Sequence, residues 1–433
     1  MTISSSLNAG VAGLNANASK LATISDNIAN SSTYGYKRAE TDFHSVVTSS
    51  GSSSTYSAGG VRTTSLRLID ERGPLIGTSS ATDIAVNGSG FIPVTTISAV
   101  DSSSGSYPVT LATTGSFYPD EDGILRTATG EVLLGWPAAA DGSIGSYPRD
   151  SLSALKPVNV TANQYAANPT TTASISANLP ATWTAAGASN DPIEIPVEYF
   201  DNLGNSQTMT VTFTPDVPAS GSSNAWTMTV TDGVSGSVVG EYTLTFDATQ
   251  GSGGTLASVA TVSGGAYDAT TGTMDIGVAG GTIALTIGKP GSNSGLTQLS
   301  DSYYPGTVTK NGSAVGSLVS VAFDESGKLY ATYDQGFSRC IWQVPVVDVA
   351  NTNGLIALDN QTYRMTPASG SFYLWDAGTG PTGTISGYSR EESSTDVATE
   401  LTQLIQTQRA YSSNAKVIQT VDEMLQETTN LKR

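Results

Sequence analysis

Apolar residues follow a helix-type spacing only at the two ends of the chain. Between Ile3 and Ile28 they recur at alternating steps of four and three residues, which places them on one face of a helix. Such a stripe is about 39 Å long at 1.5 Å per residue. Gly10 and Asn17 interrupt it. Near the other end, from Val397 onward, the same spacing recurs.

These two stripes predict helices that need a partner. The alternative is a pair of ordinary core-facing helices in a globular domain. Both stripes lie at chain termini, however, and nearly everything between them has the pattern of strands. Each helix must therefore pair with its sister terminus or with other chains, and we favour assembly. The residues expected at the polymer interface are Leu7, Leu14, Leu21, Ile28, Leu401, Leu404, Tyr411, Ile418 and Leu425.

Between about residues 60 and 390 the apolar positions alternate with period two, as in half-buried strands. Apolar residues alternate over 193–199 and again over 209–213, and 201–205 between them has the composition of a turn. A second hairpin is expected around the turn 324–328. Many short strands with Gly, Asn and Asp turns indicate antiparallel sandwich or barrel domains. The fold class is therefore mainly β with α-helical termini.

Two polar stretches, 162–172 and 288–305, look like domain boundaries. They bracket a middle β zone, so the simplest architecture is nested, with one antiparallel β domain inserted in another. The expected parts are a terminal-helix domain (1–30 and 391–433), an extended connector (31–70), a first β domain (71–165 and 300–390) and an inserted outer β domain (166–299).

The chain is strongly acidic, with 37 Asp and Glu against 19 Lys and Arg and a formal net charge of −18. Nucleic acid and anionic membrane surfaces would repel such a chain, so neither is expected as a partner. No apolar stretch is long enough for a membrane-spanning helix, and membrane insertion is not expected. The N-terminus lacks the basic start of a secretory signal peptide, so export without a cleaved signal is expected.

Candidate chemistry is scarce. His44 is the only histidine, so no His–His metal pair can form, and Cys340 is the only cysteine, so no intramolecular disulfide can form. We interpret Cys340 as a small buried residue on a strand. The acidic run 120–123 lacks the later ligands of a calcium loop and fits a hairpin turn better. We expect no catalytic, cofactor-binding or metal-binding residues and no enzymatic activity.

The segment that follows the first predicted helix reads Ser-Asp-Asn-Ile-Ala-Asn-Ser-Ser-Thr-Tyr-Gly-Tyr-Lys-Arg, residues 25–38. It resembles the signature of the flagellar axial proteins, the rod and hook family. Asn30 and Gly35 tolerate left-handed backbone angles, so the helix can end and the chain can turn there. Asn27 can bond backbone at that exit. Asn27, Asn30, Gly35 and Lys37 are the candidate helix-exit residues.

Two further segments carry the same resemblance. Residues 408–425 are similar to the C-terminal helix of the family, and 83–91 are similar to the entry to its first β domain. Ile92 departs from the pattern, since a second aromatic residue is common there in the family. Together the matches cover about a quarter of the chain.

The resemblance implies a structural subunit of the bacterial flagellum. In that family the terminal helices stack into the inner wall of a helical tube and the β domains form outer layers. It implies a homopolymer that is extracellular, leaves through the flagellar export apparatus and grows beneath a cap. Length, Lys37 and a single inserted domain favour the hook, a flexible joint that transmits torque from rod to filament.

Two alternatives stay open. The first is another axial component, such as a distal rod or hook–filament junction protein. Under the favoured interpretation these same proteins, with the hook cap, are the expected partners. The second is an acidic, β-rich surface adhesin, which would require a secretory signal and would not require matched helical termini.

Overall fold

The structure is a computed structural model that describes residues 3–47, 58–102 and 107–430. It divides into two compact units, each described by itself here. The first unit comprises Met1–Ala162, Val321–Ala331 and Arg339–Arg433, and the second comprises Asn163–Ser320 and Thr332–Ser338. The second unit is thus an insertion in the chain of the first. It extends beyond the expected limits of 166 and 299, because strand β23 (Tyr304–Lys310) pairs with β13 (Thr172–Leu179) inside it.

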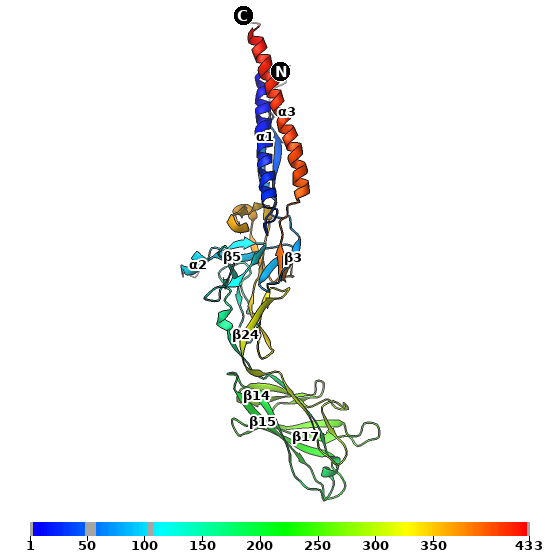
Figure 1. Cartoon of the computed structure of the whole chain (residues 1–433). Coiled ribbons are helices and arrows are strands. Elements are labelled where there is room, and N and C mark those ends of the chain that lie inside the picture. The colour runs from blue at the N-terminus through cyan, green and yellow to red at the C-terminus, as the bar shows by residue number, and fades with distance from the viewer. Residues whose placement is uncertain (1–2, 48–57, 103–106, 431–433) are drawn as a thin grey trace. The chain divides into compact units, whose positions relative to one another are not determined.

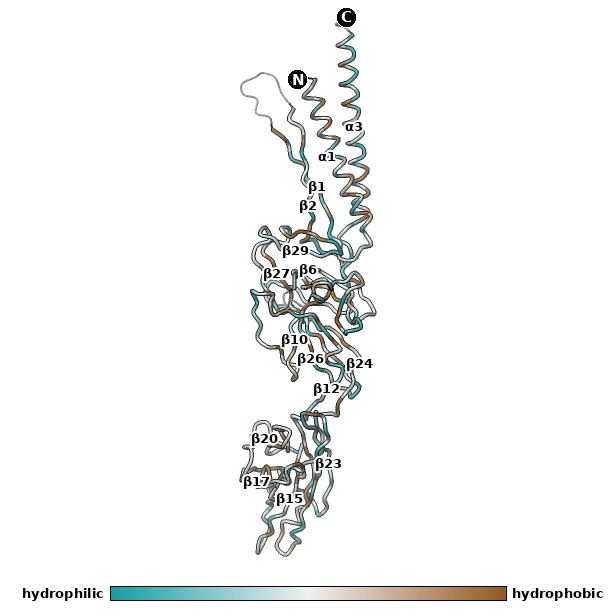
Figure 2. The backbone as a smooth tube through the Cα atoms, turned by 90° about the vertical axis from the view of Figure 1, so that its left-hand side faces the viewer, coloured by the Kyte–Doolittle hydropathy of each residue, from teal (hydrophilic) through white to brown (hydrophobic). Residues whose placement is uncertain are grey.

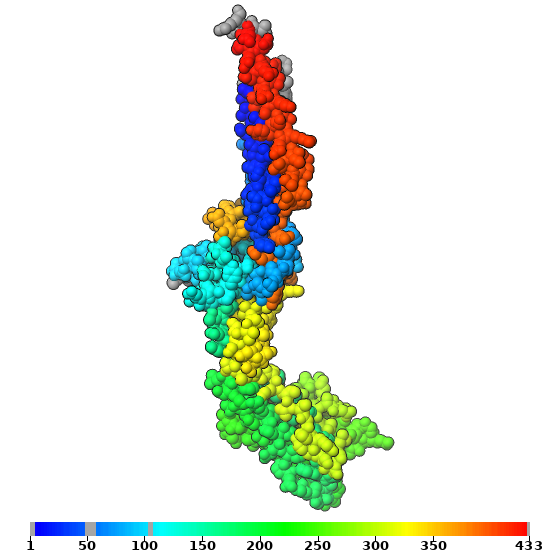
Figure 3. Space-filling view, viewed as in Figure 1, coloured from blue at the N-terminus to red at the C-terminus, as the bar shows by residue number. Residues whose placement is uncertain are grey.

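The chain ends form two long helices, α1 (Ile3–Ala29) and α3 (Val397–Asn430). Figure 1 shows them side by side and antiparallel, and Figure 3 shows their side chains in contact along the pair. Asp396 caps α3, since its Oδ1 accepts hydrogen bonds from the N–H groups of Ala398 (2.8 Å) and Thr399 (3.3 Å). Asp396 is the last residue before α3, so its carboxylate satisfies N–H groups of the first turn, which have no partner within the helix.

The segment expected as an extended connector contains a β-hairpin instead. Strands β1 (Ala39–Ser45) and β2 (Val61–Arg67) pair in antiparallel register. The hairpin lies along α1 (Figure 2), where the Thr23 and Thr41 hydroxyls are 3.0 Å apart and Lys20 lies over the ring of Phe43. Most of the Gly/Ser-rich stretch 49–60, predicted as a loop, lies outside the described residues.

The β part of the first unit is a set of small sheets around an apolar core. The main sheet runs in the order β26-β10-β5-β6-β29-β28. Phe91, Leu134, Trp136, Val347 and Tyr363 are buried in the core. The strands of the main sheet and those that pair beside it are β5 (Ile92–Thr96), β6 (Thr110–Ala112), β8 (Tyr118–Pro119), β9 (Leu125–Arg126), β10 (Glu131–Pro137), β11 (Lys156–Pro157), β25 (Lys328–Tyr333), β26 (Ser338–Gln343), β28 (Ile356–Ala357) and β29 (Tyr363–Arg364).

Three smaller sheets complete this unit. Their strands are β3 (Leu75–Gly77) with β32 (Ser389–Glu391), β31 (Thr384–Gly387) with β4 (Asp83–Asn87) and β7 (Thr114–Ser116), and β27 (Val346–Val349) with β30 (Phe372–Trp375). The short helical elements of the chain are α2 (Ile97–Asp101) and the 3-10 turns Thr161–Asn163, Ala181–Thr184, Thr352–Gly354, Asp359–Gln361 and Pro367–Ser369.

The second unit is a β-sandwich with its own core. One sheet is β14 (Ile193–Phe200), β15 (Ser206–Pro215), β16 (Ala225–Asp232), β17 (Val238–Phe246) and β18 (Leu256–Ser263). The other comprises β13, β19 (Tyr267–Asp268), β20 (Thr273–Val278), β21 (Gly281–Thr286), β22 (Leu296–Gln298) and β23. Strands β12 (Tyr165–Asn168) and β24 (Ser313–Phe323) lie beside the boundary. Alternate residues of both sheets, such as Trp226 and Leu285, are fully buried between them.

The expected fold class, mainly β with helical termini, is confirmed. The hairpin expected around 201–205 is β14–β15. The acidic run is the turn between β8 and β9, where the Asp120 carboxylate accepts the Asp122 and Ile124 N–H groups. Cys340 is buried on β26. One departure is β13, which pairs in parallel with β21 and β22. Its partners follow only after the other sheet has been built, which gives the long crossover that parallel pairing requires.

Excision of the second unit tests the insertion. The Asn168 side-chain amide donates to the Asn311 carbonyl (2.9 Å) and to Ser313 Oγ (3.3 Å), so the two ends are adjacent. Replacing 169–311 with a short Gly-Ser linker should leave the first unit folded, because the removed segment carries its own core. Circular dichroism and thermal unfolding check this. Loss of cooperative unfolding would show that the first unit needs the insertion.

Candidate assembly surface and helix-exit network

The two terminal helices approach most closely at two glycines of α1. A Cβ atom added at Gly10 would lie 3.1 Å from Cγ1 of Ile418, and one added at Gly13 would lie 2.9 Å from Nδ2 of Asn414. Both glycines are buried. Gly10, which interrupts the sequence stripe, is therefore a point of helix contact, because the missing side chain lets α3 come close.

The nine predicted interface residues do not form a buried seam between α1 and α3. Among them Leu7, Leu14, Leu21, Ile28, Leu404 and Ile418 are half-buried. The other three, Leu401, Tyr411 and Leu425, are exposed to 47, 41 and 39%. Four more apolar side chains on α3 are exposed. We call the whole set the exposed apolar surface of α3: Val397, Leu401, Ile405, Tyr411, Val417, Met424 and Leu425.

This surface has a regular arrangement. Val397, Leu401 and Ile405 follow one another at four-residue steps, which places them in a row along the first turns of the helix. Val417 and Met424 share a second face at a seven-residue step. The helix pair thus covers part of its apolar surface and leaves the rest to an outside partner.

At the base of the pair, Asn27 holds three chain segments together. Its amide nitrogen donates to the Ala39 carbonyl (2.8 Å) and to Glu400 Oε1 (3.1 Å). Its Oδ1 accepts from the Ala39 N–H (2.8 Å) and from the Tyr36 hydroxyl (3.1 Å). Asn27 is 1% exposed. It therefore joins the end of α1 to the start of β1 and to the first turn of α3, as the sequence motif suggested in part.

Lys37 makes a buried ion pair. Its Nζ lies 2.6 Å from Glu391 Oε1 and also donates to the Glu71 carbonyl at 2.8 Å, and the Lys37 and Glu391 side chains are 0 and 1% exposed. The same Glu391 oxygen accepts the N–H of Gly73. Burial lowers the pKa of Lys37 to about 8, and the neighbouring Glu391 carboxylate opposes that shift.

Arg38 contacts α3 and the segment that leads into it. Its guanidinium lies 3.7 Å from Glu400 Oε1, and its backbone N–H donates to Ser394 Oγ at 2.9 Å. Burial of Glu400 raises the pKa of that carboxyl, which Arg38 and Asn27 offset in part. We refer to Asn27, Lys37, Arg38, Glu391 and Glu400 as the exit network.

The two remaining helix-exit residues are Gly35 and Asn30. Gly35 has the expected left-handed backbone, with φ of 71°, and a Cβ there would lie 3.0 Å from Cγ2 of Thr114. Asn30 does not adopt the left-handed backbone that its side chain would tolerate, since its φ is not positive. Its side-chain amide instead donates to the Asp26 carbonyl and carboxylate at 2.9 and 3.0 Å. Asn30 therefore ends the helix through side-chain hydrogen bonds.

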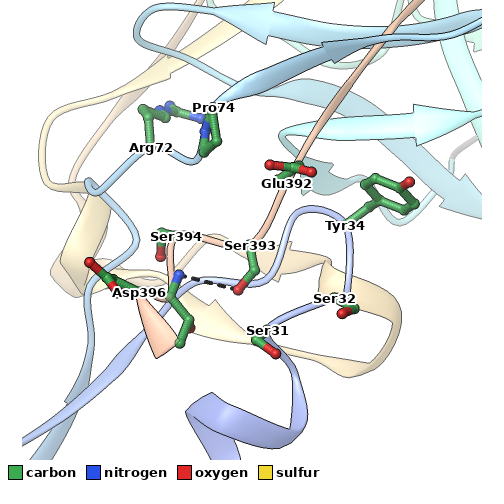
Figure 4. Close-up of a pocket in the computed structure, with 10 residues that line it drawn as sticks. Ser31, Ser32, Tyr34, Arg72, Pro74, Glu392, Ser393, Ser394 and Asp396 are labelled. Carbon is green, nitrogen blue, oxygen red and sulfur yellow. Dashed lines mark hydrogen bonds between the residues drawn. The ribbon is translucent and has the colours of Figure 1, made fainter. Parts of the chain in front are cut away.

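A pocket of about 470 Å³ lies where the chain leaves α1 and enters α3 (Figure 4). Hydroxyl groups line much of it, including those of Ser31, Ser32 and Ser393. The Oγ of Ser393 accepts the Thr395 N–H at 3.2 Å. Arg72, Glu392 and Asp396 line it as well. Its mixed charges select neither an anion nor a cation.

Among the described residues, no group of three or more His, Cys, Asp or Glu side chains is placed to hold a metal ion. His44 is exposed on β1. None of the helices in the described part of the chain is both long and apolar enough to cross a membrane.

Models of three flagellar families match the chain. Residues 7–37 match the flagella basal body rod protein family, and 385–431 match the C-terminal part of the flagellar basal body rod FlgEFG proteins. Residues 159–313, nearly all of them in the second unit, match the D2 domain of the flagellar basal body protein FlaE. Helical ends that match rod proteins at both termini define the class as a flagellar axial protein.

Full-length comparisons identify the family within that class. The chain is 33% identical to the flagellar hook protein FlgE of Brucella suis biovar 1 (strain 1330) and 31% identical to that of Rhizobium meliloti (strain 1021), over 100% of each chain. It is 28% identical to FlgE of Escherichia coli (strain K12), over 98% of each chain. The chain belongs to the flagellar hook protein family.

One solved structure that resembles the chain is the crystal structure of Helicobacter pylori flagellar hook protein FlgE2. The TM-score is 0.42 at 13% identity, over 72% of this chain and 98% of that chain.

A cysteine pair tests the contact between α1 and α3. Gly13→Cys combined with Asn414→Cys should form a disulfide on mild oxidation of the monomer, because the two positions are in contact. Gel mobility and mass spectrometry of a peptide digest detect the link. Gly13→Cys with Gln408→Cys, which places the second thiol six residues away on α3, should stay reduced. Equal cross-linking of both pairs would contradict the described register.

Substitution of Lys37 tests the buried pair. Lys37→Met leaves the Glu391 carboxylate buried without its cation, so it should lower the free energy of unfolding by about 3–5 kcal/mol. Lys37→Met with Glu391→Gln removes both charges, keeps the acceptor for Gly73 and should recover most of that loss. Chemical unfolding at neutral pH measures both variants. Equal destabilisation of the single and double variants would show that the charge pairing is unimportant.

Proposed function

We propose that this chain is a structural subunit of the flagellar hook that assembles with copies of itself through its terminal helices. The observation that carries the proposal is the exposed apolar surface of α3, seven apolar side chains on a helix whose only described helical neighbour is α1. Full-length similarity to flagellar hook proteins supports the hook as the structure in which the chain assembles.

The proposed polymer is a tube whose wall contains helix pairs. Leu7, Leu14, Leu21, Ile28, Leu404 and Ile418 are half-buried, so a neighbouring copy can complete their burial together with the exposed residues of α3. The exit network holds the pair at the β part of the first unit. In the tube, the β units lie outside the helices, which fits the division of the chain that the sequence suggested.

The finer roles belong to the same proposal. The polymer acts as a flexible joint that transmits torque from rod to filament. Its further partners are the distal rod, the hook–filament junction proteins, the hook cap and the flagellar export apparatus, and the chain is exported without cleavage of a signal. We assign it no catalytic step and no cofactor. The hook is favoured over the rod and the junction because the full-length relatives described above carry the name of hook proteins.

Charged substitutions on α3 test the assembly surface. Leu401→Asp and Tyr411→Asp change exposed side chains, so the free energy of unfolding of the monomer should change by no more than about 0.5 kcal/mol. In a dry contact with another copy the same carboxylate would be buried and unpaired, so tube formation should be lost. Electron microscopy after induced polymerisation and a swimming assay measure the outcome.

The matched control is Gln406→Asp, which adds the same charge at an exposed polar position beside Ile405. It should assemble. If Leu401→Asp and Tyr411→Asp form tubes as readily as the wild type, the exposed apolar surface of α3 is not the assembly contact.

A further inference from the structure

A smaller pocket in the first unit contains a cation that has no anion beside it. The pocket has a volume of about 290 Å³ and is lined by Tyr34, the residue before Gly35 in the segment that leaves α1. Arg390 of β32 lines it too, and its Cζ lies 3.8 Å from the centre of the Tyr34 ring. Within the described part of the chain no carboxylate pairs with Arg390, and its Nε is buried without a hydrogen-bond partner. Arg390 therefore brings a charged group with unused N–H donors to this pocket.

The one carboxylate that lines the same pocket already has its partners. Glu131 is 8% exposed, and its Oε1 accepts the side-chain amide of Asn360 at 2.6 Å. Its Oε2 accepts the hydroxyl groups of Thr127 and Thr129. Because both oxygens of Glu131 are hydrogen-bonded to neutral groups, Arg390 stays available to a ligand.

A turn in a strained conformation forms another part of the wall. Asn360 and Gln361 are adjacent, and both have left-handed backbones, with φ of 61 and 56°. Residues other than glycine adopt this conformation at a cost in free energy, and such residues are concentrated at ligand-binding and functional sites. The side-chain amide of Gln361 has no hydrogen-bond partner among the described residues. The turn thus supplies a second unused polar group to the pocket.

The deepest part of the pocket is apolar. Val94, Ala112 and Phe117 line it and are 0, 6 and 1% exposed. Ligand pockets combine such apolar walls with a few polar groups, and most have volumes of about 300–1,000 Å³. This pocket is at the small end of that range, so it fits a small molecule with an apolar body better than a segment of another chain.

The charge around the pocket limits the charge of the ligand. The second unit has twelve Asp and Glu residues and two Lys, a net charge of −10, which leaves −8 of the total of −18 on the first unit. A doubly charged phosphate would be repelled by this charge and by Glu131 in the same pocket. A carboxylate carries one charge, and its two oxygens match the planar fork of a guanidinium.

We propose that this pocket binds a small monocarboxylate with an apolar body. Arg390 binds the carboxylate, the amide of Gln361 donates to it, and the apolar body lies against the deep wall. The proposal goes beyond the proposed function, because it concerns the single subunit and does not require the polymer. A bound carboxylate also adds a contact between Tyr34, which follows α1, and β32, which precedes α3.

Titration of the full-length monomer with benzoate tests the site. Benzoate should bind with a dissociation constant of about 1 mM or lower, as measured by isothermal titration calorimetry. Benzamide has the same shape without the charge and should bind at least about tenfold more weakly. In nuclear magnetic resonance spectra the Nε–H signal of Arg390 should shift with benzoate and stay in place with benzamide.

Substitution of Arg390 tests where the ligand binds. Arg390→Lys keeps the charge but loses the planar fork, so it should weaken benzoate binding about tenfold while the melting temperature stays close to that of the wild type. Arg390→Met should abolish binding. Arg364→Lys is the matched control, since Arg364 is exposed on β29 and does not line the pocket, and it should bind as the wild type does.

The remaining outcomes each overturn a stated part of the proposal. Absence of benzoate binding, equal binding of benzamide, or equal binding by Arg390→Lys and Arg390→Met would exclude the carboxylate site at Arg390. Tighter binding of inorganic phosphate would show that the site selects another anion. Tighter binding of a peptide with a central glutamate would assign the pocket to an acidic side chain of a partner. None of these measurements requires tubes, so their failure would leave the proposed function standing.

Discussion

The buried pair of Lys37 and Glu391 is the interaction on which the first unit depends. It joins two residues 354 positions apart, one just after α1 and one just before α3. Taking both charges out of water costs free energy that the attraction between them only partly returns, so the pair adds little net stability. The pair fixes the relative position of the two chain segments, because moving either side chain away would leave the other charge buried and unpaired. Asn27 and Glu400 then place the first turn of α3 beside the last turn of α1.

The close contact between α1 and α3 depends on these interactions at the end of α1 and the start of α3. The exit network places the end of α1 beside the start of α3, and Gly10 and Gly13 then allow a close approach farther along the pair. Two helices can cover only one side of each other, however. The row of Val397, Leu401 and Ile405 stays exposed for this reason.

Local patterns predicted the elements that local chemistry determines. The helices at the ends, the β14–β15 hairpin, the turn at Asp120 and the left-handed Gly35 all follow from residues close together in the sequence. Features that depend on distant partners could not be predicted. No sequence spacing indicates that Lys37 pairs with Glu391. In the sequence Gly10 only interrupts the apolar stripe, and its role becomes clear from its contact with Ile418. The hairpin within the expected connector was missed for a similar reason, since β1 pairs with β2, and the paired positions are up to 28 residues apart in the sequence (Ala39 with Arg67).

The two units carry different shares of the net charge. The second unit holds −10 of the net −18, so the first unit, with the larger number of residues, holds the smaller share. Helix contacts can therefore be extensive and apolar without strong repulsion between copies. On the second unit, with its net charge of −10, a contact between copies would bring like charges together.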